Sequence, residues 1–250
     1  MILAVIFNMP KEVITEEAKD GKGFMLGLAV DAVIFGFHDR QLKVLLLEYK
    51  QTGLFALPGG FIRTKENLND AATRIVTRRT GLHNIYLQQF YTFGDYSRYD
   101  PTPMKAIMNA KGIKAPADHW LLQRFITVGY LALVDFTKAL PTPDAISDSC
   151  RWYDLNALPV LMQDHRSIID KALETLQLTL DQKLTGFNLL PEQFTMGDLQ
   201  SVYETILGKP LIRAAFQRKM LGLGILELVA KKMTGKAHKA PYLYRFINKT

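Results

Sequence analysis

The sequence is poor in cysteine and in long apolar runs. Cys150 is the only cysteine among 250 residues, so no internal disulfide is possible, and a reducing cytoplasm is the expected location. No run approaches the roughly 18 consecutive apolar residues that a membrane-spanning helix requires, so we expect no membrane association. The apolar opening lacks a basic segment and is followed by the acidic stretch 12–20, which argues against a secretory signal.

The composition is that of a folded protein. Hydrophobic residues make up 48% of the chain and charged residues 22%. A chain of this length buries roughly seven tenths of the surface that it exposes when unfolded, so a substantial core is available and a disordered chain is excluded. The length suits one large domain or two small ones.

Positive charge is concentrated towards the end of the chain. The formal net charge is +7, and residues 181–250 hold eleven basic and five acidic residues. The end of the chain therefore carries +6, and the part before it carries only +1. This distribution favours a module that binds a polyanion, attached to a nearly neutral module.

The first two thirds of the chain predict a mixed order of strands and helices. Period-two and period-3.6 patterns predict strands at 29–37, 42–48, 85–93, 125–134 and 151–154, and helices at 67–81 and 167–182. Residues 53–61 read as irregular, with a turn at Pro58-Gly59-Gly60. Strands mixed with helices in this way indicate an α+β or α/β sandwich.

A long connection at 96–123 shows little alternation and contains three prolines. It far exceeds the usual connection of about 4–6 residues. Within it, the segment 101–120 is interpreted as a lid on a pocket, a dimer contact or a disordered insertion.

The end of the chain has the order helix, tight turn, helix, basic hairpin, which is that of a winged helix-turn-helix. We place the domain boundary near 185–188. Thr195 is a helix cap with Asp198 at the third helical position, and the helix runs to Leu207. A second helix is expected at 211–221, with strands at 225–230 and 242–247 around a basic loop.

The second of these helices suits DNA recognition, which needs an apolar side for docking and a polar side for the groove. The expected apolar side is Leu211, Ile212, Ala215, Phe216 and Met220. Arginine binds guanine and glutamine pairs with adenine, while lysines on the wing suit phosphates. The residues assigned to DNA are Thr195, Arg213, Gln217, Arg218, Lys219, Lys231, Lys232, Lys236, Lys239 and Tyr242.

Five fixed positions form a specific motif in the front part of the chain. Gly60, Glu66, Arg74, Gly81 and Leu82 have the spacing of the Nudix box, G-x5-E-x7-R-E-U-x-E-E-x-G-U, where U is aliphatic. Residues 24–182 therefore resemble a Nudix domain, which implies an α/β/α sandwich. Hydrolases of that family cleave nucleoside diphosphates linked to another group, with Mg²⁺ or Mn²⁺ held by the glutamates of the box.

The carboxylates that would hold this metal are missing from the segment R-E-U-x-E-E. Ile75, Arg78 and Arg79 stand in place of its three glutamates. Replacing two carboxylates by two guanidinium groups changes the local charge by four units. The resulting positive charge would repel a divalent cation. We therefore expect no enzyme activity, no metal and no cofactor.

The two arginines have two possible roles. They grip a diphosphate directly, or they are last-turn cations that extend into solvent. Arg74 and Glu66 are interpreted as braces between loop and helix. The residues assigned to the ligand are Arg63, Glu66, Arg74, Arg78 and Arg79.

A second resemblance covers residues 186–246. Segments such as Gly186-Phe187-Asn188-Leu189-Leu190-Pro191 and Tyr242-Leu243-Tyr244-Arg245-Phe246 are similar to the winged helix of the Nudix-related transcriptional regulators. That group includes repressors of NAD metabolism and regulators of sugar catabolism. The resemblance implies a ligand-sensing domain fused to a DNA reader, working as a homodimer on a near-palindromic operator. The expected division is an N-terminal extension at 1–23, a Nudix-like sensor at 24–182 and a winged-helix domain at 183–250.

The resulting hypothesis is a repressor of NAD metabolism whose degenerate Nudix domain senses a nucleotide sugar, ADP-ribose above all. A sugar-responsive operon regulator is the nearest alternative. An active ADP-ribose pyrophosphatase would need carboxylates from elsewhere, for which Asp95, Asp100 and Asp118 are candidates. A nonspecific nucleic-acid binder is the third alternative. Its affinity for DNA would depend steeply on salt concentration and little on base sequence.

Overall fold

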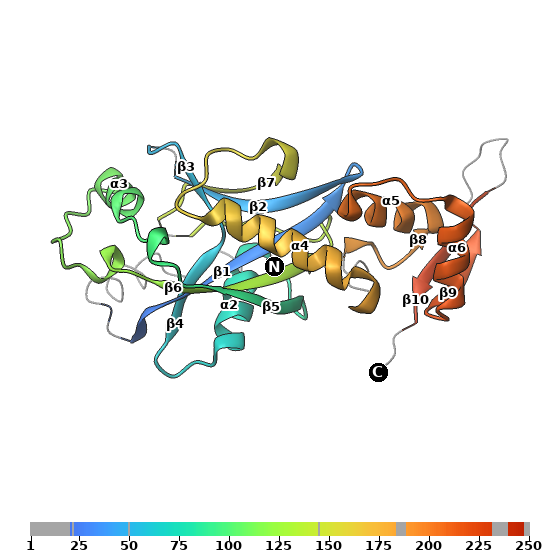
Figure 1. Cartoon of the computed structure of the whole chain (residues 1–250), viewed down its shortest axis with the longest axis horizontal. Helices are drawn as coiled ribbons and strands as arrows, with labels where there is room; N and C mark the ends of the chain where they lie inside the picture. Colours follow the sequence, from blue (N-terminus) through green and yellow to red (C-terminus); the bar gives the residue numbers. More distant parts are fainter. Residues whose placement is uncertain are drawn as a thin grey trace, which may run out of the picture.

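The computed structural model describes residues 21, 23–49, 51–144, 146–183, 189–231 and 240–247, and of residues 181–183 only the backbone. Within this part of the chain, a seven-stranded sheet with its helices forms one end of the molecule and a small three-stranded sheet with two helices forms the other (Figure 1). None of the helices described is long and apolar enough to cross a membrane.

The larger sheet consists of β1 (Phe24–His38), β2 (Gln41–Tyr49), β3 (Leu54–Ala56), β4 (Gly59–Arg63), β5 (Tyr86–Phe93), β6 (Ile126–Val134) and β7 (Ser149–Asp154). Its helices are α2 (Leu68–Thr80), α3 (Thr102–Ala110) and α4 (His165–Lys183), with short 3-10 helices η1 (Tyr96–Arg98), η2 (Trp120–Leu122) and η3 (Leu155–Ala157). The small domain contains β8 (Phe194–Thr195), α5 (Met196–Leu207), α6 (Arg213–Gly222), β9 (Leu226–Lys231) and β10 (Tyr242–Phe246).

Strand β1 is the centre of the larger sheet. It pairs in parallel with β6 and antiparallel with β2 and β4, in the order β3-β2-β1-β6-β5 with β7 beside β2. Successive side chains of a strand point to opposite faces. Val30 accordingly packs with α2, whereas Val33 and Phe35 pack with α4. Helices on both faces of one sheet make the α/β/α sandwich that the sequence predicts.

Helix α2 has the boundaries that its sequence indicates. Ala71, Ala72 and Ile75 form its buried face. Gly81 ends the helix with a φ of 69°, a left-handed conformation that glycine adopts without steric cost. The box motif therefore begins within β4 at Gly60 and continues through a loop and α2 to Gly81 and Leu82.

Two segments differ from the sequence-based expectation. The region 53–61, expected to be irregular, contains β3 and the start of β4, and Gly59 and Gly60 pair with β1 instead of forming a turn. The pairing partners lie about thirty residues away in the chain, which local turn signals do not reveal. The interpretation of the segment 101–120 as a disordered insertion is wrong. The segment contains α3 and the first residue of η2, and Ile107 and Trp120 are buried.

The small domain is a winged helix, as expected. Thr195 Oγ1 accepts a hydrogen bond from Asp198 N at 3.1 Å, and Asp198 Oδ2 accepts one from Thr195 N at 2.8 Å, which completes a capping box at α5. The docking side of α6 is narrower than expected. Phe216 and Met220 are buried, but Ile212 and Ala215 are exposed because the helix begins only at Arg213 and docks along a single i, i+4 line.

The two domains share one continuous core. Val44 and Leu46 of β2 and Ile169 of α4 belong to the same buried cluster as Val202 and Ile206 of α5. Gln177 Nε2 of α4 donates to Ile206 O at 2.8 Å. Thr205 Oγ1 donates to Arg40 O, in the turn between β1 and β2, at 3.2 Å. Helix α4 therefore connects the sandwich with the winged-helix domain (Figure 1).

Candidate ligand pocket and DNA interface

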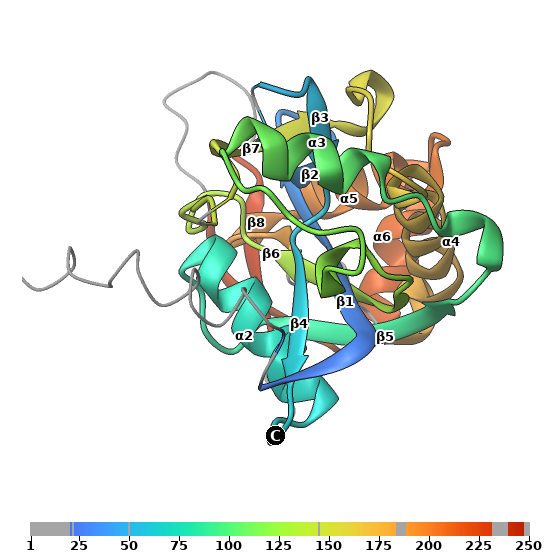
Figure 2. The same cartoon turned by 90° about the vertical axis from the view of Figure 1, so that its left-hand side faces the viewer.

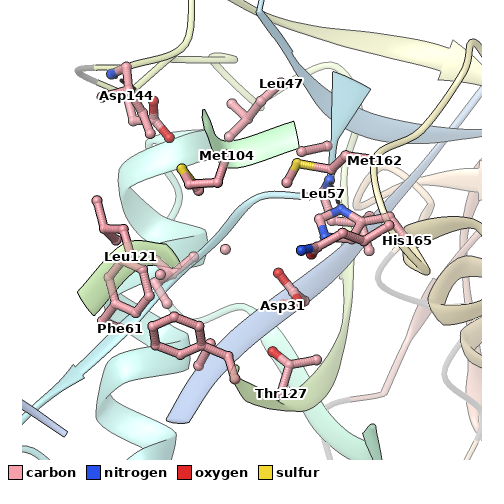
Figure 3. A pocket seen from close by; sticks show the side chains of 18 of the residues that line it. Asp31, Leu47, Leu57, Phe61, Met104, Leu121, Thr127, Asp144, Met162 and His165 are labelled. Atoms are coloured by element: carbon pink, nitrogen blue, oxygen red, sulfur yellow. Dashed lines mark hydrogen bonds between the residues drawn. The ribbon is translucent and has the colours of Figure 1, made fainter. Parts of the chain in front are cut away.

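The structure contains a cavity of about 290 Å³ that is lined in part by α3. Figure 2 faces the end of the sandwich where α3 lies, away from the winged helix. The cavity is bounded by β1, β4 and β6, by the C-terminal half of α2, by α3 and by the start of α4. Figure 3 shows side chains from β1, β4, β6, α3 and the start of α4 converging on it. Pro101, Met104 and Trp120 of the segment 101–120 form part of the pocket wall, and the lid and the dimer contact both stay predictions.

Four of the five residues assigned to the ligand line this cavity, namely Arg63, Arg74, Arg78 and Arg79. Glu66 does not. From the sequence alone, only Arg74, Arg78 and Arg79 could be placed together, on one helix. The structure adds Arg63, which is the last residue of β4.

Arg74 and Glu66 form a brace, as the sequence predicts. Arg74 Nε donates to Glu66 Oε1 at 2.6 Å and its Nη2 donates to Glu66 Oε2 at 2.7 Å. The same Nη2 donates to Phe61 O at 2.9 Å, while Arg63 N donates to Glu66 Oε2 at 3.1 Å. The hydrogen bonds from Arg74, and then that from the Arg63 amide, hold the pKa of Glu66 below its ordinary value. Arg74 therefore joins α2 to β4, through Phe61 O, and to the loop between them, through Glu66.

Arg79 does not extend into solvent, because only 11% of its side chain is exposed. Its Nη2 lies 3.4 Å from Asp144 Oδ2 and its Nη1 donates to Thr142 O at 3.4 Å. Burial, followed by the nearby Asp144 carboxylate, raises the pKa of Tyr49 in the same wall. The positive charge of Arg79 is therefore largely balanced by the carboxylate of Asp144, and Arg79 attracts an anion less strongly than Arg78 does.

Arg78 is, together with Arg63, an exposed cation of the cavity, and no carboxylate in the described part of the chain forms an ion pair with it. Its pKa is lowered first by burial and then by Arg74, Arg63 and Arg79 around it. Several guanidinium groups facing one opening create a positive potential that attracts an anion. The arrangement suits a phosphate or diphosphate, since the planar fork of arginine matches phosphate oxygens.

A divalent cation does not fit these residues. No group of three or more His, Cys, Asp or Glu side chains in the described ranges is arranged to hold a metal ion. Of the carboxylates considered as substitutes for the box glutamates, Asp100 lines the cavity, whereas Asp95 and Asp118 do not. Asp100 Oδ1 accepts a hydrogen bond from Thr102 N at 2.9 Å, at the start of α3.

An aromatic cluster forms the wall of the cavity next to the arginines. The Trp120 ring stacks on Phe24 with centroids 5.8 Å apart and meets Phe61 edge-on at 4.6 Å. Phe125 lies 5.2 Å from Phe61. Such a wall offers ring faces and edges to a planar base. The sequence analysis missed it because its members come from four separate places in the chain.

Three polar side chains form the floor of the cavity, and the sequence analysis missed these too. Asp31, Thr127 and His165 come from β1, β6 and α4. His165 Nδ1 accepts a hydrogen bond from Leu57 N at 2.8 Å, which fixes its ring. One signal was visible in the sequence, because Asp31 is a charged residue within an otherwise apolar strand.

On the opposite domain, α6 presents a polar face to solvent. Arg213 and Arg218 are exposed and Gln217 is partly exposed on this helix, and Lys219 is exposed beside them. Ile212, at the N-cap of α6, is 79% exposed, although it was expected to dock. An exposed apolar side chain at this end of a recognition helix suits a thymine methyl group.

The wing is described in part. Lys231 Nζ lies 5.6 Å from the centroid of the exposed Tyr242 ring, which pairs the two across β9 and β10. Lys232, Lys236 and Lys239 lie outside the described residues. The hydroxyl group of Thr195 forms part of the N-terminal cap of α5, where Oγ1 also donates to Asp198 Oδ2 at 2.8 Å.

Comparisons with known proteins agree with this division. A family model of the Nudix domain matches residues 25–176, and one of the NrtR DNA-binding winged helix domain matches residues 186–246. The ADPR responsive transcriptional repressor NtrR of Acinetobacter baylyi is 32% identical over 227 residues, which cover 88% of this chain and 81% of that protein. The chain belongs to the NrtR family of Nudix regulators.

Structural similarity extends over both NrtR domains. The crystal structure of Shewanella oneidensis NrtR complexed with a 27mer DNA has a TM-score of 0.68 and 30% identity, covering 88% of this chain and 93% of that one. An ADP-ribose pyrophosphatase of Methanocaldococcus jannaschii is 25% identical over 154 residues, 60% of this chain and 78% of that enzyme. Both resemblances seen in the sequence are thus confirmed. The domain boundary near 185–188 lies outside the described residues and stays a prediction.

Proposed function

We propose that this chain is a DNA-binding transcriptional repressor, acting on genes of NAD metabolism, whose sensor domain binds ADP-ribose. The observation that carries the proposal is the joining of an NrtR-type winged helix to a Nudix cavity with arginines at the metal positions. The Acinetobacter baylyi relative is described as an ADPR responsive repressor, which supports the same effector.

The cavity offers a contact for each part of ADP-ribose. Arg78 and Arg63 bind the diphosphate without a metal, and Arg79 stays on Asp144 as part of the wall. The aromatic cluster around Phe61 and Trp120 packs against the adenine. Together these contacts bind an anionic nucleotide and leave it intact.

The DNA reader uses the exposed face of α6 and the wing. Arg213, Gln217 and Arg218 reach base edges in the major groove, and the lysines of the wing and Lys219 contact phosphates. Two copies of the chain bind a near-palindromic operator as a homodimer, which gives two recognition helices one half-site each. ADP-ribose lowers the operator affinity of this dimer, and a coupling of about 1–3 kcal/mol between the two sites suffices for a switch.

The test is a titration of the full-length protein and a labelled operator fragment with ADP-ribose, NAD and simple sugars. We expect ADP-ribose to release the DNA at concentrations that leave a random duplex of equal length unaffected. Release by a pentose alone would establish the sugar-responsive alternative. Unchanged operator affinity with every compound would overturn the effector assignment, and equal affinity for both duplexes would establish a nonspecific binder.

We further propose that the chain does not hydrolyse ADP-ribose, since Ile75, Arg78 and Arg79 replace the carboxylates of the box. The similarity to the Methanocaldococcus jannaschii pyrophosphatase favours the rival activity. The two are separated by incubating the protein with ADP-ribose and Mg²⁺ or Mn²⁺ and measuring AMP. Metal-dependent release of AMP would refute our assignment.

A further inference from the structure

The floor of the cavity contains polar groups that a diphosphate does not use. Thr127 is completely buried in β6, and its Oγ1 has no hydrogen-bond partner within the described residues. Threonine in that position costs stability, because a buried hydroxyl loses its hydrogen bonds to water. Thr127 is among the residues that line the cavity, so a polar group of a bound ligand is a candidate partner for this hydroxyl.

Asp31 lies on the same face as Thr127 and one strand away. In the parallel pair of β1 and β6, Ala29 is opposite Thr127, and Asp31 is two residues further along β1. Figure 3 shows the Asp31 side chain between Thr127 and His165. No ion pair or hydrogen bond of the Asp31 carboxylate occurs in the part of the chain described, although the residue is only 9% exposed.

The backbone leaves room for this carboxylate. A Cβ on Gly59, which is opposite Asp31 in β4, would overlap Asp31 Oδ1. Glycine at this position of the Pro58-Gly59-Gly60 segment therefore leaves the space that the carboxylate occupies. Next to it, Leu57 N donates to His165 Nδ1, so the neutral His165 ring carries its proton on Nε2 and is a donor on that side.

These groups are a poor match for phosphate and a good match for a sugar. An ionised carboxylate repels a phosphate but accepts two hydrogen bonds from neighbouring hydroxyls. A threonine hydroxyl both donates and accepts, and the His165 ring adds a donor. The cavity thus separates into an arginine side for the diphosphate and an acidic floor for a vicinal diol.

We propose that Asp31, Thr127 and His165 form a diol-binding subsite that holds the terminal ribose of ADP-ribose and makes the sensor prefer it to other adenine nucleotides. This inference rests on the proposed function and assigns the part of the ligand that distinguishes ADP-ribose from ADP. Asp31 is the specificity-determining residue, and Thr127 and His165 complete the set of hydrogen bonds to the diol.

The experiment is calorimetric titration of the full-length protein with two ligands of equal charge. One is ADP-ribose, and the other is the methyl ester of ADP on its terminal phosphate, which keeps the diphosphate but lacks the sugar. The wild type is expected to bind ADP-ribose at least about tenfold more tightly than the methyl ester. Asp31→Asn removes that preference, because it lowers ADP-ribose affinity about tenfold and leaves the affinity for the methyl ester within twofold.

Two further variants separate the subsite from a general effect on folding. Thr127→Val keeps the shape of the side chain and removes the unpartnered hydroxyl, so it should lower ADP-ribose affinity about fivefold while the unliganded protein melts at the same or a higher temperature. Asp100→Asn is the matched control, since Asp100 also lines the cavity but its Oδ1 is bonded to Thr102 N. It should leave the preference for ADP-ribose unchanged.

The outcomes distinguish this inference from the function on which it rests. If ADP-ribose binds and Asp31→Asn weakens both ligands equally, or neither, the subsite is wrong while the effector assignment stands. If the preference is lost equally in Asp100→Asn, Asp31 has no special role. If neither ligand binds the wild type, the effector assignment fails and the subsite fails with it.

Discussion

Replacing Arg78 by glutamine tests whether the cavity binds an anion through free positive charge. Arg78 lines the cavity, is exposed and forms no ion pair with the acidic residues described, whereas Arg74 is bound to Glu66 and Arg79 to Asp144. Removing it therefore removes one of the two exposed cations of the cavity, the other being Arg63. A charge-assisted hydrogen bond contributes about 1.5–3 kcal/mol, and the exposure of Arg78 places the effect near the lower end.

The expected result is a loss of ADP-ribose affinity of roughly 10–30-fold, which is about 1.4–2 kcal/mol, measured by calorimetry at low salt. The difference between wild type and Arg78→Gln should shrink in 0.5 M salt, since exposed charges are screened there. The unliganded variant should be at least as stable as the wild type, because burial and then Arg74, Arg63 and Arg79 disfavour the charged Arg78 and lower its pKa.

Arg166→Gln is the matched control for this variant. Arg166 is an exposed arginine of α4 that pairs with Asp170 at 3.0 Å and does not line the cavity. It should leave ADP-ribose affinity within twofold of the wild type. The reasoning would be refuted if Arg78→Gln bound ADP-ribose like the wild type, or if Arg166→Gln weakened binding as much as Arg78→Gln does.

Three further perturbations test the brace, the domain contact and the reader. Glu66→Gln should lower the free energy of unfolding by about 1–2 kcal/mol at pH 7. Because Arg74 lowers the pKa of Glu66 below 4.5, this loss is present above that pH and disappears as the pH falls through the folded-state pKa. A loss that does not depend on pH in urea titrations would contradict this prediction. Gln177→Ala should leave ADP-ribose affinity unchanged but reduce the factor by which ADP-ribose weakens operator binding. An unchanged factor in gel-shift titrations would show that the hydrogen bond from Gln177 to Ile206 O plays no part in the coupling between the two sites. Arg218→Ala should weaken operator binding by about 1–3 kcal/mol and should weaken binding to a random duplex by less than that. Equal losses on both duplexes would show a phosphate contact.

Local sequence signals predicted the elements that depend on near neighbours. Helix α2 begins and ends within one residue of the expected positions, because Gly81 and the spacing of its apolar residues act within a few turns. The capping box of Thr195 and Asp198 was equally visible, since both partners lie three residues apart. The box motif likewise located the arginines of the cavity.

Features that depend on distant partners were not visible. Gly59 looks like a turn residue, and its place in β4 follows from pairing with β1. The partner of Arg79 is Asp144, 65 residues further along the chain, so the sequence left its exposure open. Similarly, Asp31, Thr127 and His165 meet only because β1 and β6 are adjacent in the sheet and α4 begins beside Leu57.

Helix α4 gives a physical route between the cavity and the DNA reader. Its first residue, His165, lines the cavity and is bonded to Leu57 N, and twelve residues later Gln177 is bonded to Ile206 O at the end of α5. A helix rises 1.5 Å per residue, so these two contacts are about 18 Å apart along one rigid element. Because α4 and α5 share a single buried core, a ligand that shifts His165 cannot move the start of α4 alone. A displacement of this helix therefore changes the position of α5, and with it the position of α6, which packs on α5 through Phe216 and Tyr203.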